Sequence, residues 1–246
     1  MTDQVLPIEG QPLSQGARVL DTFIAPTKTF TDILRSTSWW LPFVIGTVVA
    51  YALTFGIGQK VTWSGLVDNE IQANPKLAQQ VADATPDVAA TIHKRMLYGY
   101  EIPFYASPAV NIIFLLFIAV ILWPTINFAF GGNATYGQVF SVLNYAYLPA
   151  AIKGLITVVV LFVGSSAENF TVENMLGTNL GYYLGTAGAL KTLLTSFDLF
   201  TLWTLVLMSI GLGIVAKTKR STGFIVVFGW WVLIVLVKTG FAAIQS

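Results

Sequence analysis

Residues 193–243, LLTSFDLFTLWTLVLMSIGLGIVAKTKRSTGFIVVFGWWVLIVLVKTGFAA, decide the fold class of this chain. Two apolar stretches, Leu193–Ala216 and Thr222–Ala243, flank the short basic turn Lys217-Thr218-Lys219-Arg220. A helix needs about 20 mostly apolar residues to cross about 30 Å of hydrocarbon, and each stretch has that length. The pattern therefore predicts two membrane-spanning helices that form an antiparallel hairpin.

Three earlier stretches of the same kind extend this prediction to an all-α polytopic membrane protein, a bundle of about five transmembrane helices. They are Trp39–Gln59, Tyr105–Phe130 and Tyr145–Gly164. Composition agrees, because 55% of the 246 residues are hydrophobic and 10% are charged, whereas soluble domains carry about 25% charged residues. We expect a flexible N-terminal tail over residues 1–16 and a single membrane domain over residues 17–246.

Several classes of function are excluded by what the chain lacks. With no cysteine, it has no disulfide and no thiolate metal site. The single histidine, His93, lies in a polar stretch without clustered carboxylates, which makes it a poor metal ligand. A net charge of +1 gives no electrostatic reason to bind nucleic acid. No nucleophile–base–acid set or phosphate-binding loop is visible, so we expect no enzymatic activity, cofactor or nucleic-acid partner.

Basic residues predict the orientation in the membrane. The turn at 217–220 carries three cations and no anion, and Arg18, Lys28 and Arg35 precede the first span. Basic residues favour the cytoplasmic side, and five spans place the N-terminus and this turn on the same side. We therefore expect a cytoplasmic N-terminus and an outside C-terminus. The long segment after the first span is also basic, but long segments translocate with less regard to charge.

An amphipathic stripe precedes the first span. It includes Phe23, Ile24, Phe30, Ile33 and Leu34 at nearly helical spacing, and Pro26 interrupts it. The stripe predicts two short helices in the headgroup region; packing on the protein's own spans is an equal alternative. Further short helices are expected near 75–83 and 86–97, because Asn74-Pro75 and Thr85-Pro86 each pair an N-cap residue with proline. Residues 165–192 predict a short helix with irregular chain.

Three ionisable residues fall inside the predicted spans and are candidate functional groups: Lys153, Asp198 and Lys238. Asp198 and Lys238 each lie about 20 residues from the centre of the basic turn, so they share one depth. We predict an Asp198–Lys238 ion pair, either structural or part of a coupled proton or ion site. The alternative is that Lys153 takes the carboxylate, which leaves Lys238 to reach the outer headgroups.

Two asparagines, Asn127 and Asn144, add uncharged polar groups to the spans. Asparagine side chains in spans commonly hydrogen-bond across helices. We therefore interpret both as contacts that hold helices together, not as a conduction path.

Several segments, taken in order, resemble the Yip family, five-span membrane proteins named for interaction with Ypt/Rab small GTPases. The segments are FIAPTKTF at 23–30, WWLP at 39–42, YGQVF at 136–140, YAYLP at 145–149 and DLFTLW at 198–203. The resemblance extends over most of residues 20–243. It implies an all-helical domain with a cytoplasmic N-terminus, and in eukaryotic members an adaptor role in Golgi and endoplasmic-reticulum trafficking.

The chain departs from the trafficking branch and is more similar to short prokaryotic members. It lacks that branch's long polar N-terminal tail and its Asp-Leu-Tyr-Gly-Pro element, which argues against a small GTPase partner. The resemblance implies a bacterial inner membrane protein. We expect a non-enzymatic adaptor or organiser that contacts the lipid bilayer and a membrane or cytoplasmic protein, with an oligomer possible. The alternative is a transporter, channel or lipid-translocating protein that uses Lys153, Asp198 and Lys238.

Overall fold

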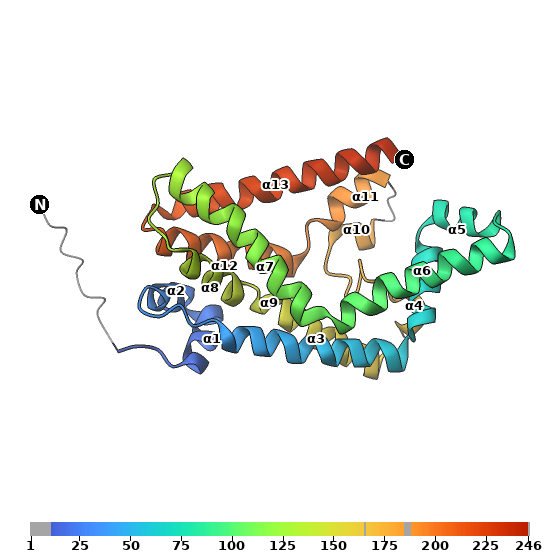
Figure 1. Ribbon diagram of the computed structural model, residues 1–246, viewed down its shortest axis with the longest axis horizontal. Coiled ribbons are helices and arrows are strands. Elements are labelled where there is room, and N and C mark those ends of the chain that lie inside the picture. The colour runs from blue at the N-terminus through green and yellow to red at the C-terminus, as the bar shows by residue number, and fades with distance from the viewer. Residues whose placement is uncertain (1–10, 165, 185–187, 246) are drawn as a thin grey trace, which may run out of the picture. The chain divides into compact units, whose positions relative to one another are not determined.

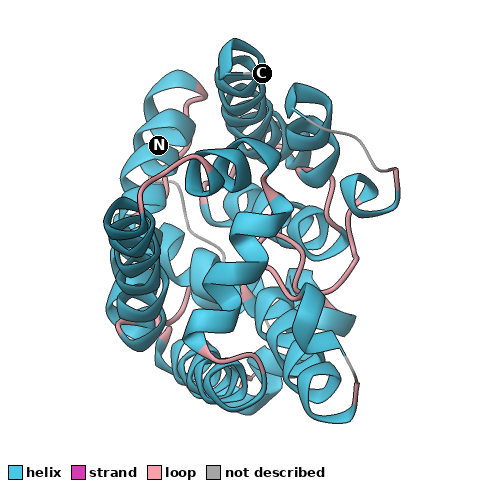
Figure 2. Cartoon of the chain, turned by 90° about the vertical axis from the view of Figure 1, so that its right-hand side faces the viewer, coloured by secondary structure: helices cyan, strands magenta, loops and turns pink. Residues whose placement is uncertain are grey.

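The computed structural model describes residues 11–164, 166–184 and 188–245. Within these ranges the chain consists of helices and loops (Figure 2). One isolated antiparallel bridge joins Asn179 and Asp198. The chain divides into two compact units, each described by itself. Unit 1 comprises Met1–Val44, Phe114–Pro149 and Leu202–Val237; unit 2 comprises Ile45–Ile113, Ala150–Thr201 and Lys238–Ser246.

Four helical segments are long and apolar enough to cross a membrane. They are α3 (Trp40–Lys60), α7 with η1 (Ser107–Pro124, Thr125–Ala129), α8 with α9 (Tyr136–Ala146, Leu148–Val163) and α13 (Arg220–Gln245). A shorter apolar helix, α12 (Leu199–Val215), completes the set. The predicted all-α polytopic membrane fold is therefore confirmed.

The boundaries of two spans differ from those predicted. The third span begins at Tyr136, because a capping box between Thr135 and Gln138 starts α8 there. Pro149 does not interrupt this span, since it lies in the first turn of α9, where proline needs no backbone donor. The fourth begins at Leu199, and the residues before it form the separate helix α11 (Gly188–Thr195).

In unit 1 a pair of short helices packs against α8. These helices are α1 (Gln15–Ile24) and α2 (Pro26–Ile33), separated at Pro26 as predicted. All residues of α8 from Val139 to Ala146 are buried. A Cβ added at Gly211 of α12 would lie 2.5 Å from Val142 and 2.9 Å from Phe30. Glycine therefore permits α12 to approach α8 and α2 closely.

The predicted N-terminal tail is only partly open to comparison. Residues 1–10 lie outside the described residues. The backbone N–H of Leu13 donates to Asp32 at 3.2 Å, and Ser14 caps α1 by accepting from the N–H of Ala17. Leu13 and Ser14, which fall within the predicted tail, therefore already form hydrogen bonds with the hairpin.

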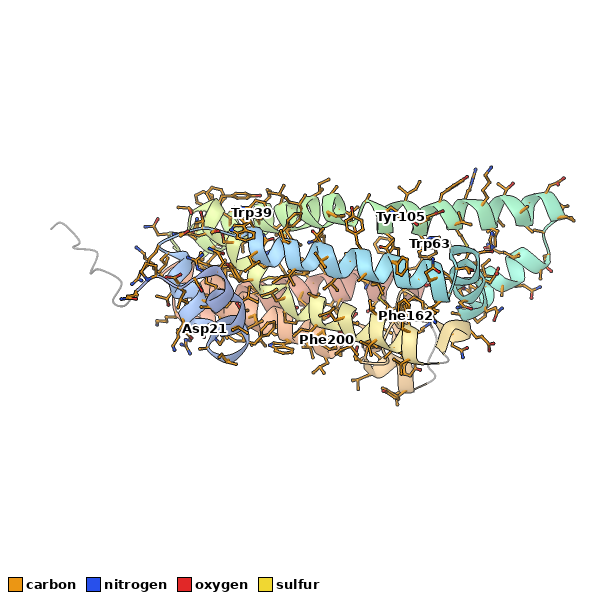
Figure 3. The ribbon with its side chains drawn as sticks, turned by 90° about the horizontal axis from the view of Figure 1, so that it is seen from below. Asp21, Trp39, Trp63, Tyr105, Phe162 and Phe200 are labelled. Carbon is orange, nitrogen blue, oxygen red and sulfur yellow. The ribbon has the colours of Figure 1, made fainter. Side chains whose placement is uncertain are left out.

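Unit 2 contains two short helices and one long helix beside the end of α3. They are α4 (Trp63–Ala73), α5 (Pro75–Ala82) and α6 (Pro86–Tyr105), and they lie beside one another (Figure 1). The helix expected near 75–83 is confirmed, whereas the one expected near 86–97 continues to Tyr105. The rings of Trp63 and Tyr105 lie 5.8 Å apart (Figure 3). Buried apolar side chains beneath these helices form one core: Leu53, Ile57, Val61, Leu66, Leu161 and Phe170.

The segment before α12 contains more helix than the one short helix that was expected. It contains the 3₁₀ turn η2 (Ser166–Asn169), α10 (Leu180–Tyr183) and α11. Asn179 caps α10 by accepting from the N–H of Tyr182 at 3.0 Å. Residues 165 and 185–187 of this segment lie outside the described residues.

Candidate functional site

Asp198 is the N-cap of α12. Its Oδ1 accepts hydrogen bonds from the backbone N–H groups of Phe200 and Thr201, both at 3.1 Å, and a longer one of 3.4 Å from the Thr201 hydroxyl. The first N–H groups of a helix have no partner within the helix, and a carboxylate satisfies them while complementing the helix dipole. The residue is 5% exposed. Capping of the helix start therefore accounts for the hydrogen bonds of one of the two carboxylate oxygens, Oδ1.

The second oxygen of Asp198 receives a cation and a hydroxyl. Oδ2 lies 2.9 Å from Nζ of Lys153 on α9 and accepts from Oγ1 of Thr178. The backbone N–H of Leu199 donates to the Thr178 carbonyl at 3.1 Å. This Asp198 network thus fastens the start of α12 to α9 and to the preceding loop, all within unit 2.

The predicted Asp198–Lys238 ion pair is wrong. Lys153 occupies that place, which was the alternative prediction, and Lys238 is exposed near the end of α13. Counting residues from the turn gives the depth of a side chain along a helix. It does not give the direction in which that side chain leaves the helix axis. That direction decides which lysine, Lys153 or Lys238, can reach Asp198.

The two asparagines make local contacts instead of cross-helix ones. Asn127 clamps the loop before α8: its Nδ2 donates to the Ala134 carbonyl at 2.8 Å, and its Oδ1 accepts from the Ala134 N–H at 2.9 Å. Asn144 donates to the Phe140 carbonyl of its own helix at 2.9 Å. Its Oδ1 is buried without a hydrogen-bond partner among the described residues. Asn127 therefore shapes a loop, and Asn144 leaves a polar atom inside unit 1.

A buried ion pair joins the two helices of the N-terminal hairpin, α1–α2. Nε of Arg18 lies 2.7 Å from Oδ2 of Asp32, and both side chains are buried. The guanidinium also donates to the carbonyls of Ser36 at 2.9 Å and Asp32 at 3.3 Å. Tyr145 of α8 donates to the side chain of Gln15 at 2.8 Å. Buried polar contacts thus join α1 to α2, and a hydrogen bond joins α1 to α8.

The amphipathic stripe is divided between the protein core and the surface. Phe30 and Ile33 are fully buried, and Leu34 is half-buried. Phe23 is half-buried, with its ring 5.5 Å from that of Trp203. Ile24 is 80% exposed. The α2 part of the stripe therefore packs on the protein, and the end of α1 faces outward.

His93 does not form a catalytic relay. Its Nε2 lies 3.2 Å from Oδ1 of Asp68 and 3.4 Å from Oγ of Ser64. A serine hydrolase triad uses opposite ring nitrogens for the acid and the nucleophile, whereas here one nitrogen meets both. Among the described residues, no group of three His, Asp or Glu side chains is placed to hold a metal ion.

A second fastening in unit 2 joins α4 to the loop after η2. Oε1 of Glu70 accepts from the backbone N–H of Val172 at 2.6 Å, and Nδ2 of Asn69 donates to the Phe170 carbonyl at 3.0 Å. Burial raises the pKa of Glu70, and the Val172 N–H offsets part of that rise. Burial likewise raises the pKa of Tyr100, whose side chain hydrogen-bonds to Glu70.

Comparison with known proteins identifies the family. The family model of the Yip1 domain matches residues 20–241. This chain belongs to the Yip1 domain family. The membrane protein YknW of Bacillus subtilis (strain 168) is 27% identical over 111 residues, which cover 45% of this chain and 46% of that protein. No solved structure matches the chain.

The Yip1 match begins within α1 and ends within α13. It contains Lys153, Asp198 and Asp32, whereas Arg18 lies just before it. In the sequence, Arg18 stands out only as a cation that orients the chain, and no pattern there points to Asp32, Thr178 or Glu70. Periodicity predicts that the apolar face of an amphipathic helix turns inward and the polar face outward, so no local signal identified Arg18 as buried.

Proposed function

We propose that this chain is an integral membrane adaptor or organiser of the Yip1 type, without enzymatic activity. The proposal places its N-terminus in the cytoplasm and its C-terminus outside a bacterial inner membrane. The observation that carries it is the α1–α2 hairpin, which Arg18 and Asp32 hold together from inside. A small element fixed in this way presents its outer surface in one conformation, which suits recognition of a partner.

The Asp198 network argues against the transport alternative. Five donors from Lys153, Thr178, Phe200 and Thr201 reach its two oxygens, whereas a carboxylate offers about four lone-pair sites. A passing cation or proton would have to displace one of these contacts. Lys238, the third residue of the transport hypothesis, is exposed and apart from the network. The network therefore favours a structural role.

The adaptor proposal is tested by site-specific cross-linking of the full chain in its native membrane. A photoreactive residue replaces Ser36 or Asn133, which are exposed in unit 1, or Val88, which is exposed in unit 2. We expect one protein to be captured reproducibly from Ser36 or Asn133 and not from Val88. Capture of no protein above an unrelated five-span control would contradict the adaptor role.

A further inference from the structure

We propose that one surface of unit 1 docks on anionic phospholipid headgroups. The surface combines the outer face of α1 with a basic rim, defined as Lys28, Lys217, Lys219 and Arg220. The inference rests on the proposed function, which assigns this surface to the cytoplasmic side of the membrane. It names the class of lipid that the adaptor would bind. It is carried by three observations on the described residues.

The first observation is that α1 is inverted compared with a helix at a water-exposed surface. Leu20 and Ile24 are 66% and 80% exposed, whereas Arg18 and Thr22 are buried. Leu20 and Ile24 are four residues apart and therefore share one face of the helix. Apolar side chains on the outer face suit the boundary between headgroups and acyl chains.

The second observation is a group of cations without carboxylate partners. Every side chain of the basic rim is exposed, and none forms an ion pair within the described part of the chain. Asp21, which belongs to the same hairpin (Figure 3), is not paired with them. Nη2 of Arg220 donates to Oγ1 of Thr27 at 3.2 Å, which brings the α12–α13 turn beside the start of α2. Positive charge therefore accumulates at one place.

The helix ends add to this positive charge. Both α2 and α13 begin here, and neither has an acidic residue in its first turn. Helix N-termini carry partial positive charge. Phosphate oxygens would complement both the helix ends and the side chains.

The third observation is the conformation of Lys217. Its φ is 54°, in the left-handed region that favours glycine. The N–H of Lys217 donates to the Ile214 carbonyl and that of Thr218 to the Gly213 carbonyl, both at 3.0 Å, which ends α12. Glycine is the usual residue at such a helix end. A lysine here retains a cation at a cost in backbone conformation, as expected where the charge has a function.

A lipid surface fits these features better than a protein. Two exposed apolar side chains are few for a protein interface, which needs about 800 Å² on each partner. An apolar helix face flanked by lysines is the pattern of a membrane-surface contact, in which each cation strengthens binding to anionic lipid by about fivefold. The apolar spans already hold this chain in a bilayer, so lipid headgroups lie close to the protein.

The test measures lipid selectivity of the full chain reconstituted in equal parts phosphatidylcholine and phosphatidylglycerol. Spin-labelled phosphatidylglycerol and phosphatidylcholine report the relative association of each lipid with the protein. We expect a preference for phosphatidylglycerol that weakens with salt and falls by about fivefold or more in the variant Lys28→Gln/Lys217→Gly/Lys219→Gln. The variant Lys94→Gln/Arg95→Gln, which removes exposed cations from unit 2, should keep it.

Lys217→Gly alone separates binding from folding. It should stabilise the turn and raise the unfolding temperature while lowering the preference for phosphatidylglycerol. No preference in the wild type, or an unchanged preference in the triple variant, would overturn the proposal. Displacement by inorganic phosphate alone would also overturn it, by indicating a site for a soluble anion. Protein capture from Ser36 or Asn133 tests the adaptor role separately, so the two can fail independently.

Discussion

At the residue scale, Asp198 shows how a buried charge is made stable. Its carboxylate contacts helix N–H groups, a hydroxyl and Lys153. These contacts replace most of the interactions with water that the carboxylate loses on burial. Removal of one partner is costly, because the other charge is left unpaired. The outcome of a single substitution therefore separates a structural pair from a transport site.

Asp198→Asn should destabilise the protein by about 2 kcal/mol, less than a fully buried pair because the Lys153 side chain is 23% exposed. Unfolding in mixed detergent micelles measures the loss. Asp198→Asn/Lys153→Met should recover part of it, since no cation is then left unpaired. Ion flux into proteoliposomes should match that of the wild type; a changed flux with unchanged stability would instead support transport.

Glu70 predicts a pH dependence of unit 2. Burial raises the pKa of Glu70 above its ordinary value of 4.5, so folding favours the protonated carboxyl. Its contribution to stability is complete below about pH 4.5 and is lost as the pH rises through the raised pKa. Glu70→Gln keeps an acceptor for Val172 and cannot ionise.

The variant should therefore gain stability relative to the wild type as the pH rises from about 4.5 to neutrality. Chemical unfolding at a series of pH values measures this difference. Asp87→Asn, which changes an exposed carboxylate at the start of α6, should show no such trend. A constant difference between Glu70→Gln and the wild type across the series would contradict the prediction.

At the element scale, the buried Arg18–Asp32 ion pair holds the N-terminal hairpin, and Arg35 is a second, more exposed partner of Asp32. Asp32→Leu should destabilise the protein by about 3–5 kcal/mol, because it leaves the buried Arg18 guanidinium without a carboxylate. Arg18→Met should cost less, because Nη1 of Arg35 remains 3.7 Å from Oδ1 of Asp32. The double variant should recover much of that loss, but not all, since the Ser36 carbonyl also loses its donor. Unfolding measurements on all three variants give the coupling. Strictly additive losses would show that the pair does not hold the hairpin.

The elements themselves were largely predictable, because helix boundaries have local causes. Asn74-Pro75 and Thr85-Pro86 fixed the starts of α5 and α6. The early start of α8 also has a readable signal, the Thr135–Gln138 capping box, which the long apolar run obscured. Which face of α1 turns inward had no such signal, since it depends on packing against α8 and on the partner of Arg18.

At the scale of the whole molecule, composition and apolar length predicted the membrane fold because both average over many residues. The contacts of the candidate site depend instead on how each helix is rotated about its own axis, which decides where a single side chain points. The depth of Lys238 along its helix can be counted from the sequence, but the direction of its side chain cannot. The ion pair with Asp198 is formed by Lys153 instead. The donors from Thr178 and Val172 lie in irregular chain, where no periodicity constrains position. Tertiary packing alone determines them.

In the proposed function, the hairpin and the basic turn face the cytoplasm. The chain has no cysteine, so single cysteines report sidedness without background. Thr218→Cys lies in the turn, and Tyr98→Cys lies at an exposed position of α6. A membrane-impermeant maleimide applied to intact cells should label Tyr98→Cys at once and Thr218→Cys only after permeabilisation. Labelling of Thr218→Cys in intact cells would contradict the cytoplasmic adaptor surface.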